Sequence, residues 1–162
     1  MIILGVDPGT AHLGWAAVSY SSGKINSSSY GCIVSNKEAK DELRLLKLFG
    51  ELGKIIHQYK PEFASVETLY FAANAKTAIP VGQARGIVLL ACAMSNIPVI
   101  SYSPREIKLA ITGDGNATKE QIQYMICKLL KLKKTPKPDD AADALAIALT
   151  HAYSARLTFK FI

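Results

Sequence analysis

The sequence is poor in the residue types that build disulfide frameworks and zinc sites. Its three cysteines, Cys32, Cys92 and Cys127, are odd in number and widely spaced, which excludes both a zinc-binding pattern and a set of paired disulfides. Its three histidines, at positions 12, 57 and 151, are equally scattered. We therefore expect reduced thiols, as in a cytoplasmic protein, and no zinc centre.

Long apolar runs are also missing. No uninterrupted apolar stretch reaches the roughly 18 residues that a transmembrane helix requires. The N-terminal stretch, MIILGVDPGT, has no basic segment, and Asp7 interrupts its apolar run too early for a signal peptide. These absences predict a cytoplasmic chain that neither crosses a membrane nor follows a secretory route.

The chain instead has an excess of basic residues and enough apolar ones for a core. Hydrophobic residues make up 49% of its 162 residues and charged ones 20%, which predicts one folded domain. The 19 Lys and Arg against 13 Asp and Glu give a net charge of +6, which favours a polyanionic partner such as nucleic acid. We expect a single domain over residues 1–155 and a C-terminal tail over 156–162.

Apolar periodicity predicts three consecutive strands, followed by alternating helices and strands. The strands are expected at 2–6, 15–20, 29–34, 60–67 and 97–102. The helices are expected at 38–59, 75–95, 103–111 and 118–132, with a last one beginning near Pro138. Short turns between the first three strands predict an antiparallel meander. The order as a whole predicts an α/β fold with a five-stranded mixed sheet flanked by helices.

Two acidic residues close predicted strands. Asp7 ends the first strand and Glu67 the fourth, although acidic residues are poor strand formers and are rarely buried unless paired or bound to metal. Strands that end at one edge of a sheet bring their last side chains together, and Asp140 and Asp143 of the last helix would join them. Four carboxylates repel one another unless cations neutralise them, and Mg²⁺ prefers oxygen ligands. The sequence therefore predicts a site for two Mg²⁺ ions, an arrangement that hydrolyses phosphodiesters.

The last predicted helix begins with three aspartates, and helix geometry alone does not separate them. Asp139 and Asp143 share a face at i, i+4 as readily as Asp140 and Asp143 share one at i, i+3. A carboxylate in the first turn also suits the positive end of the helix dipole without any catalytic role. Spacing leaves the choice between the two pairs open.

Four blocks of the sequence together resemble one known family. They are ILGVDPGT, VETLYFAANAKTA, GQARG and DDAADALAIALTHA, and in order and approximate spacing they are similar to the RuvC Holliday junction resolvases of bacteria over residues 2 to about 152. The resemblance implies an RNase H-like fold and a homodimer that nicks two opposed strands of a four-way DNA junction during recombination and repair. It also implies Mg²⁺, with Mn²⁺ able to substitute, and partnership with the RuvA–RuvB branch-migration complex.

The matching motifs also imply roles for single residues. Asp7, Glu67, Asp140 and Asp143 match the metal-binding carboxylates of the family, which leaves Asp139 as a residue of the helix start. Lys119 and Lys108 match lysines that the family places near the scissile phosphate, where a cation neutralises charge in the transition state.

Further DNA contacts are expected from aromatic and basic residues. Tyr70 and Phe71 follow the glutamate where family members place an aromatic wedge against an unstacked base, and either ring would serve. Lys131 and Lys134 belong to a lysine-rich stretch before the last helix, where they would hold DNA phosphates at the rim of the site. The apolar helix around 80–95 is a candidate dimer surface.

Three other functions fit parts of the same sequence. Actin-like and sugar-kinase ATPases share an Asp-x-Gly-Thr loop, but they need two such halves and a much longer chain. A non-catalytic DNA-binding module on the same fold would be expected to lose an acidic position, and all four are present. An RNase H that cuts RNA–DNA hybrids, or a resolvase-like protein that processes ribosomal RNA precursors, is the nearest competitor. The GQARG and DAADALAIA stretches favour the junction enzyme.

Overall fold

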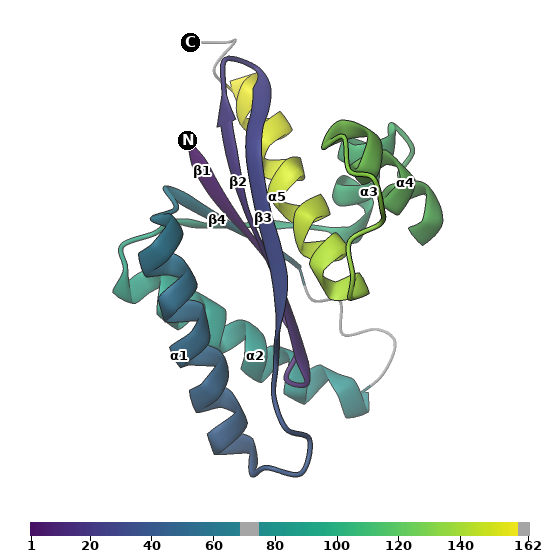
Figure 1. Ribbon diagram of the computed structural model, residues 1–162. Helices are drawn as coiled ribbons and strands as arrows, with labels where there is room; N and C mark the ends of the chain where they lie inside the picture. The colour runs from purple at the N-terminus through teal and green to yellow at the C-terminus, as the bar shows by residue number, and fades with distance from the viewer. Residues whose placement is uncertain (69–74, 159–162) are drawn as a thin grey trace.

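A five-stranded sheet between two layers of helices forms the part of the chain that the computed structural model describes, residues 1–68 and 75–158 (Figure 1). The elements in chain order are β1 (Ile2–Asp7), β2 (His12–Ser21), β3 (Lys24–Val34), α1 (Asp41–Tyr59), β4 (Phe63–Glu67), α2 (Ala75–Met94), β5 (Val99–Tyr102), α3 (Pro104–Thr112), α4 (Lys119–Leu129) and α5 (Asp139–Thr158). Each predicted strand and helix therefore has a counterpart.

The sheet has the mixed topology that the sequence predicts. Its strand order is β3-β2-β1-β4-β5, with β1–β2 and β2–β3 antiparallel and with β1–β4 and β4–β5 parallel. The first three strands form the meander, and the helices α1 and α2 provide the crossovers that the parallel pairs need. β1 and β4 are thus neighbours that end at the same edge, which is the condition on which the predicted acidic site depends.

Several boundaries differ from the predicted ones. β3 begins at Lys24 instead of 29, because Ser22 and Gly23 both have positive φ and form a tight turn whose twist matches that of the strands. β3 lies at the sheet edge, where polar residues can face solvent, so its weak apolar pattern concealed its length. α4 ends at Leu129, short of the predicted 132, and Lys131 has a positive φ of 53°. α5 continues to Thr158, beyond the predicted start of the tail.

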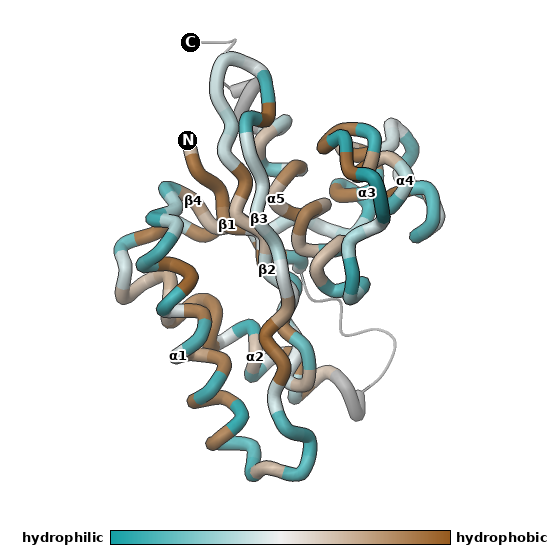
Figure 2. The backbone as a smooth tube through the Cα atoms, in the orientation of Figure 1, coloured by the Kyte–Doolittle hydropathy of each residue, from teal (hydrophilic) through white to brown (hydrophobic). Residues whose placement is uncertain are grey.

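Two hydrophobic clusters cover the two faces of the sheet. On one face, α1 and α2 pack against the side chains of Leu4 and Val6. On the other, α5 packs with α3 and α4 against the face that carries Ile3. Figure 1 shows this division, with α1 and α2 on the side opposite α5. Hydrophobic and hydrophilic residues alternate along α1 as expected for an amphipathic helix (Figure 2).

Glycines let α5 lie directly on the sheet. A β-carbon at Gly5 of β1 would lie 2.6 Å from the Ala148 nitrogen, and one at Gly14 of β2 would clash with the carbonyl group of Asp140. Any larger residue at these positions would push the helix away from the strands. Although α2 and α5 are rich in apolar residues, no helix within the two described ranges is long and apolar enough to cross a membrane.

Candidate active site

Asp7 and Glu67 lie side by side at the edge where β1 and β4 end. Side chains alternate between the faces of a strand, so Asp7 shares the α5 face with Ile3, whereas Leu4 and Val6 face the other helices. Val66 pairs with Val6, which brings the next residue of each strand, Glu67 and Asp7, to the same level of the sheet. The predicted meeting of two strand-end carboxylates is confirmed.

The first turns of α5 bring further carboxylates to this edge. Gly14 is the partner of Asp7 in the antiparallel ladder, and the backbone of Asp140 rests against Gly14. The close contact therefore fixes the beginning of α5 beside the end of β1. Asp143, almost one turn further along the helix, extends from there toward the strand ends.

A cavity of about 290 Å³ opens where these elements meet. Its polar lining consists of Asp7, Glu67, Asp143, Lys108 and Lys119, and its apolar lining of Pro104, Ile107, Ile122, Ala146 and Ile147. Strand ends, α3, α4 and α5 thus converge on one hollow. Asp140 is not among these lining residues, but its charge acts on both Asp7 and Asp143.

The carboxylates of the cavity repel one another. Burial, then the charges of Asp143, Glu67 and Asp140, raise the pKa of Asp7 to about 7, against a lowering effect from Lys119. Burial and then Asp143 raise the pKa of Glu67, while the nearby Lys108 lowers it. Burial also raises the pKa of Asp143. Acidic groups that are partly buried and crowded in this way favour a cationic ligand.

Asp140 lies on the side of β2 and β3. Cys32 of β3 is the ladder partner of Gly14, which the Asp140 backbone touches. Burial, followed by the charge of Asp140, raises the pKa of the Cys32 thiol to about 11. Asp140 also raises the pKa of Asp7, so its charge acts on the same group of carboxylates.

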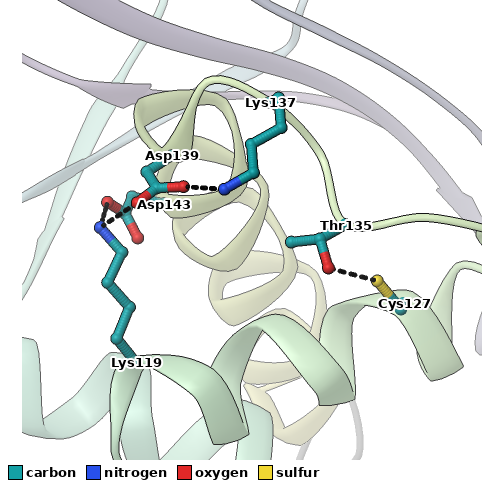
Figure 3. A network of polar contacts seen from close by, with 6 residues as sticks. All are labelled: Lys119, Cys127, Thr135, Lys137, Asp139 and Asp143. Carbon is teal, nitrogen blue, oxygen red and sulfur yellow. Dashed lines mark hydrogen bonds and ion pairs between the residues drawn. The ribbon is translucent and has the colours of Figure 1, made fainter.

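Lys119 pairs with two of the three aspartates at the start of α5 (Figure 3). Its Nζ lies 3.2 Å from Asp143 Oδ2 and 3.4 Å from Asp139 Oδ2, and Lys137 Nζ lies 2.9 Å from Asp139 Oδ1. Asp139 occupies the first turn, as predicted, but it also binds two lysines. Although partial burial acts to lower the pKa of Lys119, Asp143 and then Asp139 raise it, so Lys119 stays protonated.

The other predicted DNA-contacting residues are spread more widely. Lys108 lines the cavity near Glu67. Lys131 and Lys134 are exposed in the connection between α4 and α5, and Lys134 lines a separate hollow beside α4. Tyr70 and Phe71 lie outside the described residues.

The donor set fits a hard divalent cation, because Asp7, Glu67 and Asp143 offer only oxygen atoms and are destabilised by their mutual charge. Among the residues that the structure describes, no three His, Cys, Asp or Glu side chains are arranged closely enough to hold a metal ion as they stand. The Lys119 ammonium group supplies the positive charge beside Asp143.

Arg85 of α2 is a site residue whose role the sequence did not reveal. Its Nη1 donates to the backbone carbonyl of Glu67 at 2.9 Å, and its Nη2 donates to Ser101 Oγ at 2.8 Å. The guanidinium group thus bridges the ends of β4 and β5 and holds the backbone that carries Glu67. The GQARG block contains Arg85, but a hydrogen bond to a distant backbone carbonyl leaves no pattern in the sequence.

Removing the charge of Asp7 should stabilise the protein when divalent cations are absent. Because folding raises the pKa of Asp7 from 3.8 to about 7, the folded state binds this proton more tightly, and stability falls as pH rises from about 4 through about 7. Asp7→Asn should therefore raise the free energy of unfolding at pH 8 by ~1–3 kcal/mol and change it little at pH 4. Urea unfolding at both pH values checks this. An equal change in the free energy of unfolding at the two pH values would contradict the raised pKa of Asp7.

Comparisons with known proteins agree with this geometry. The family model described as Crossover junction endodeoxyribonuclease RuvC matches residues 3–151. Proteins of that description from Pseudothermotoga lettingae and Fusobacterium nucleatum are 49% and 47% identical to the chain; the matches cover 99% and 95% of this chain and 99% and 81% of the relatives.

Solved structures give the same result. A structure described as T. thermophilus RuvC in complex with Holliday junction substrate superposes with a TM-score of 0.91 at 34% identity, covering 98% of this chain and 96% of that one. A fowlpox virus resolvase in complex with Holliday junction DNA, at 18% identity and a TM-score of 0.64, shares the fold; that match covers 94% of this chain and 99% of the viral one. This chain, with its predicted RNase H-like architecture confirmed, belongs to the RuvC family of crossover junction endodeoxyribonucleases.

Proposed function

We propose that this chain resolves four-way DNA junctions by metal-dependent hydrolysis of two opposed phosphodiester bonds, in recombination and repair. The observation that carries the proposal is the cavity in which Asp7, Glu67 and Asp143 meet two lysines, in a chain of the RuvC family. In each cut, a water oxygen bonds to phosphorus as the bond to the 3′ oxygen breaks. The products are a 5′-phosphate and a 3′-hydroxyl, and the water proton passes to solvent.

The carboxylates have the role of holding divalent cations. Asp7, Glu67, Asp140 and Asp143 would bind two Mg²⁺ ions, or Mn²⁺ in their place, because their charges act on one another at this edge of the sheet. Bound metal supplies an activated water and neutralises charge on the reacting phosphate. Burial and the repulsion between carboxylates both raise the pKa of Asp7. A bound cation would offset both effects, so the site favours metal binding.

The basic and apolar groups of the cavity act on the phosphate. Lys119 and Lys108 lie within the lining, where their ammonium groups would neutralise the charge that develops on the phosphorus centre. The isoleucine side chains of the same lining lower the local polarity and strengthen these interactions. Lys131 and Lys134, exposed outside the cavity, would hold phosphates further along the DNA. Tyr70 and Phe71 remain candidates for stacking on a base.

Two cuts on opposed strands require two active sites, so we assign the chain a homodimeric form. Ile79, Leu90 and Met94 expose large apolar side chains along α2, and Leu43 and Leu46 do so on α1. Exposed apolar residues concentrated on two adjacent helices favour a protein partner, here a second copy. Sedimentation equilibrium of the purified protein tests this assignment, and a monomer at micromolar concentration would contradict it. The RuvA–RuvB complex is the proposed partner on the DNA.

The decisive experiment compares cleavage of a synthetic four-way junction with cleavage of a plain duplex and of an RNA–DNA hybrid, each with and without Mg²⁺. We expect symmetric paired nicks in the junction alone, and only when Mg²⁺ is present. Equal cutting of the duplex or the hybrid would overturn the substrate assignment. Cleavage that survives a chelator would overturn the metal assignment.

A further inference from the structure

The loop between β1 and β2 is held by Arg44, a side chain of α1, and α1 lies on the other face of the sheet from α5. Residues 8–11 form this loop and directly follow Asp7. Arg44 of α1 donates from Nη2 to Thr10 Oγ1 at 3.3 Å and from Nε to Ser35 Oγ at 3.1 Å. Only 14% of the Arg44 side chain is exposed. A partly buried guanidinium group with two side-chain acceptors is a better-defined contact than a fully exposed ion pair.

Ser35 connects Arg44 to the backbone of the same loop. Its Oγ donates to the Thr10 carbonyl while accepting from Arg44, and its backbone N–H donates to the Ala11 carbonyl at 3.0 Å. Ser35 is 4% exposed and follows β3, so it continues the β2–β3 ladder past its last pair, His12 with Val34. Side chain and backbone thus form a connected network around the loop, and its members reinforce one another.

The guanidinium group of Arg44 makes its contacts within this chain. Its remaining nitrogen, Nη1, lies 3.5 Å from Asp41 Oδ1, so each of the three nitrogens faces an acceptor of this chain. An arginine that binds a DNA phosphate needs N–H donors that face solvent. The contacts of Arg44 therefore fix the structure of the loop and do not present a DNA-binding group.

We propose that Arg44 is a positioning residue of the nuclease reaction, which fixes the loop at 8–11 and thereby the direction of the Asp7 side chain. The inference rests on the proposed function in one respect, the role of Asp7 as a catalytic carboxylate. Asp7 is the last residue of β1, and the loop continues its backbone, so a shift of the loop would move the main chain that carries the Asp7 side chain. Displacement of a reacting group by ~1 Å can cost ~100-fold in rate. Arg85 holds the backbone of Glu67 in a comparable way on β4.

The test uses the full chain with Arg44→Met, Arg44→Lys and the matched control Lys54→Met. Lys54 is an exposed cation of the same helix, and its ion pair is with Glu51. Arg44→Met should lower kcat for junction cleavage ~10-fold, change KM less than about 2-fold, and accelerate hydrogen exchange at the amides of residues 9–11. Arg44→Lys should recover part of kcat, because one donor can still reach the loop. Lys54→Met should match the wild type in all three measurements.

Thr10→Val supplies an independent check, because it removes the one acceptor that Arg44 has on a side chain of the loop while keeping the size of that side chain. The effects of Thr10→Val and Arg44→Met on kcat should be less than additive in the double variant. Additive effects, unchanged exchange at 9–11, or faster exchange with unchanged kcat would each overturn the proposal. Wild-type protein that cuts no junction would instead overturn the proposed function, and the exchange data would still decide whether Arg44 holds the loop.

Discussion

Replacing Asp143 with asparagine should reduce the rate of junction cleavage by about 10³-fold or more while junction affinity stays within about threefold. Asparagine has nearly the same shape and can still accept a hydrogen bond from Lys119, so the change removes little except the charge. A lost carboxylate weakens the hold on the cations that the reaction needs. The loss of this carboxylate does not weaken DNA binding, because the active site then presents one negative charge fewer to the DNA phosphates. Single-turnover cleavage and a binding titration in Ca²⁺ measure the two quantities separately.

Asp139→Asn is the matched control for this prediction. Asp139 lies on the same helix and also pairs with Lys119, but it does not line the cavity. Exposed ion pairs of this kind contribute little, and Lys119 keeps its contact with Asp143, so cleavage should stay within about threefold of the wild type. If both variants lost activity equally, the effect would come through Lys119 and the assignment of Asp143 as a metal ligand would be wrong.

Gly14→Ala should destabilise the protein by ~2–3 kcal/mol and slow cleavage at least ~10-fold. The new methyl group would clash with the backbone carbonyl of Asp140, and a backbone group cannot rotate out of the way. The start of α5 must therefore move, and with it Asp140 and Asp143 relative to Asp7. Thermal unfolding and single-turnover cleavage measure the two effects. Retention of both stability and rate would show that α5 does not depend on this contact.

Gly50→Ala is the control for the glycine substitution. Gly50 is an exposed residue within α1, and a β-carbon there meets no atom of the described residues within 4 Å. Alanine stabilises a helix relative to glycine by about 0.5–1 kcal/mol, so this variant should be slightly more stable and equally active. Opposite signs of the two stability changes would separate a steric effect on α5 from a general effect of losing a glycine.

The acidic edge of the sheet was predictable because neighbouring parallel strands end at the same edge of a sheet. A carboxylate at the end of an apolar strand has few favourable places to lie, and the order of elements made β1 and β4 parallel neighbours. Asp7 and Glu67 could therefore be paired from the sequence without knowledge of the packing. The confirmed sheet topology rests on the same alternation of apolar residues, and the start of β3 was predicted five residues too late because this alternation is weak in the polar edge strand.

The choice among the three aspartates needed tertiary structure. A helix presents residues three and four positions apart to nearly the same side, so only the docking of α5 on Gly14 shows that Asp143 lines the cavity and that Asp139 does not. The roles of Arg44 and Arg85 were hidden for a different reason. Their partners are carbonyl and hydroxyl groups far away in the sequence, and such acceptors exist at almost any position.

The three cavity carboxylates come from β1, β4 and α5, which lie at the start, near the middle and at the far end of the described chain. α5 is the last of the described elements in chain order, so it is synthesised after both strands that carry the other two carboxylates. A nascent or partly unfolded chain therefore has no assembled acidic centre. We therefore expect a chain that ends before α5, and so lacks Asp140 and Asp143, to show no nuclease activity.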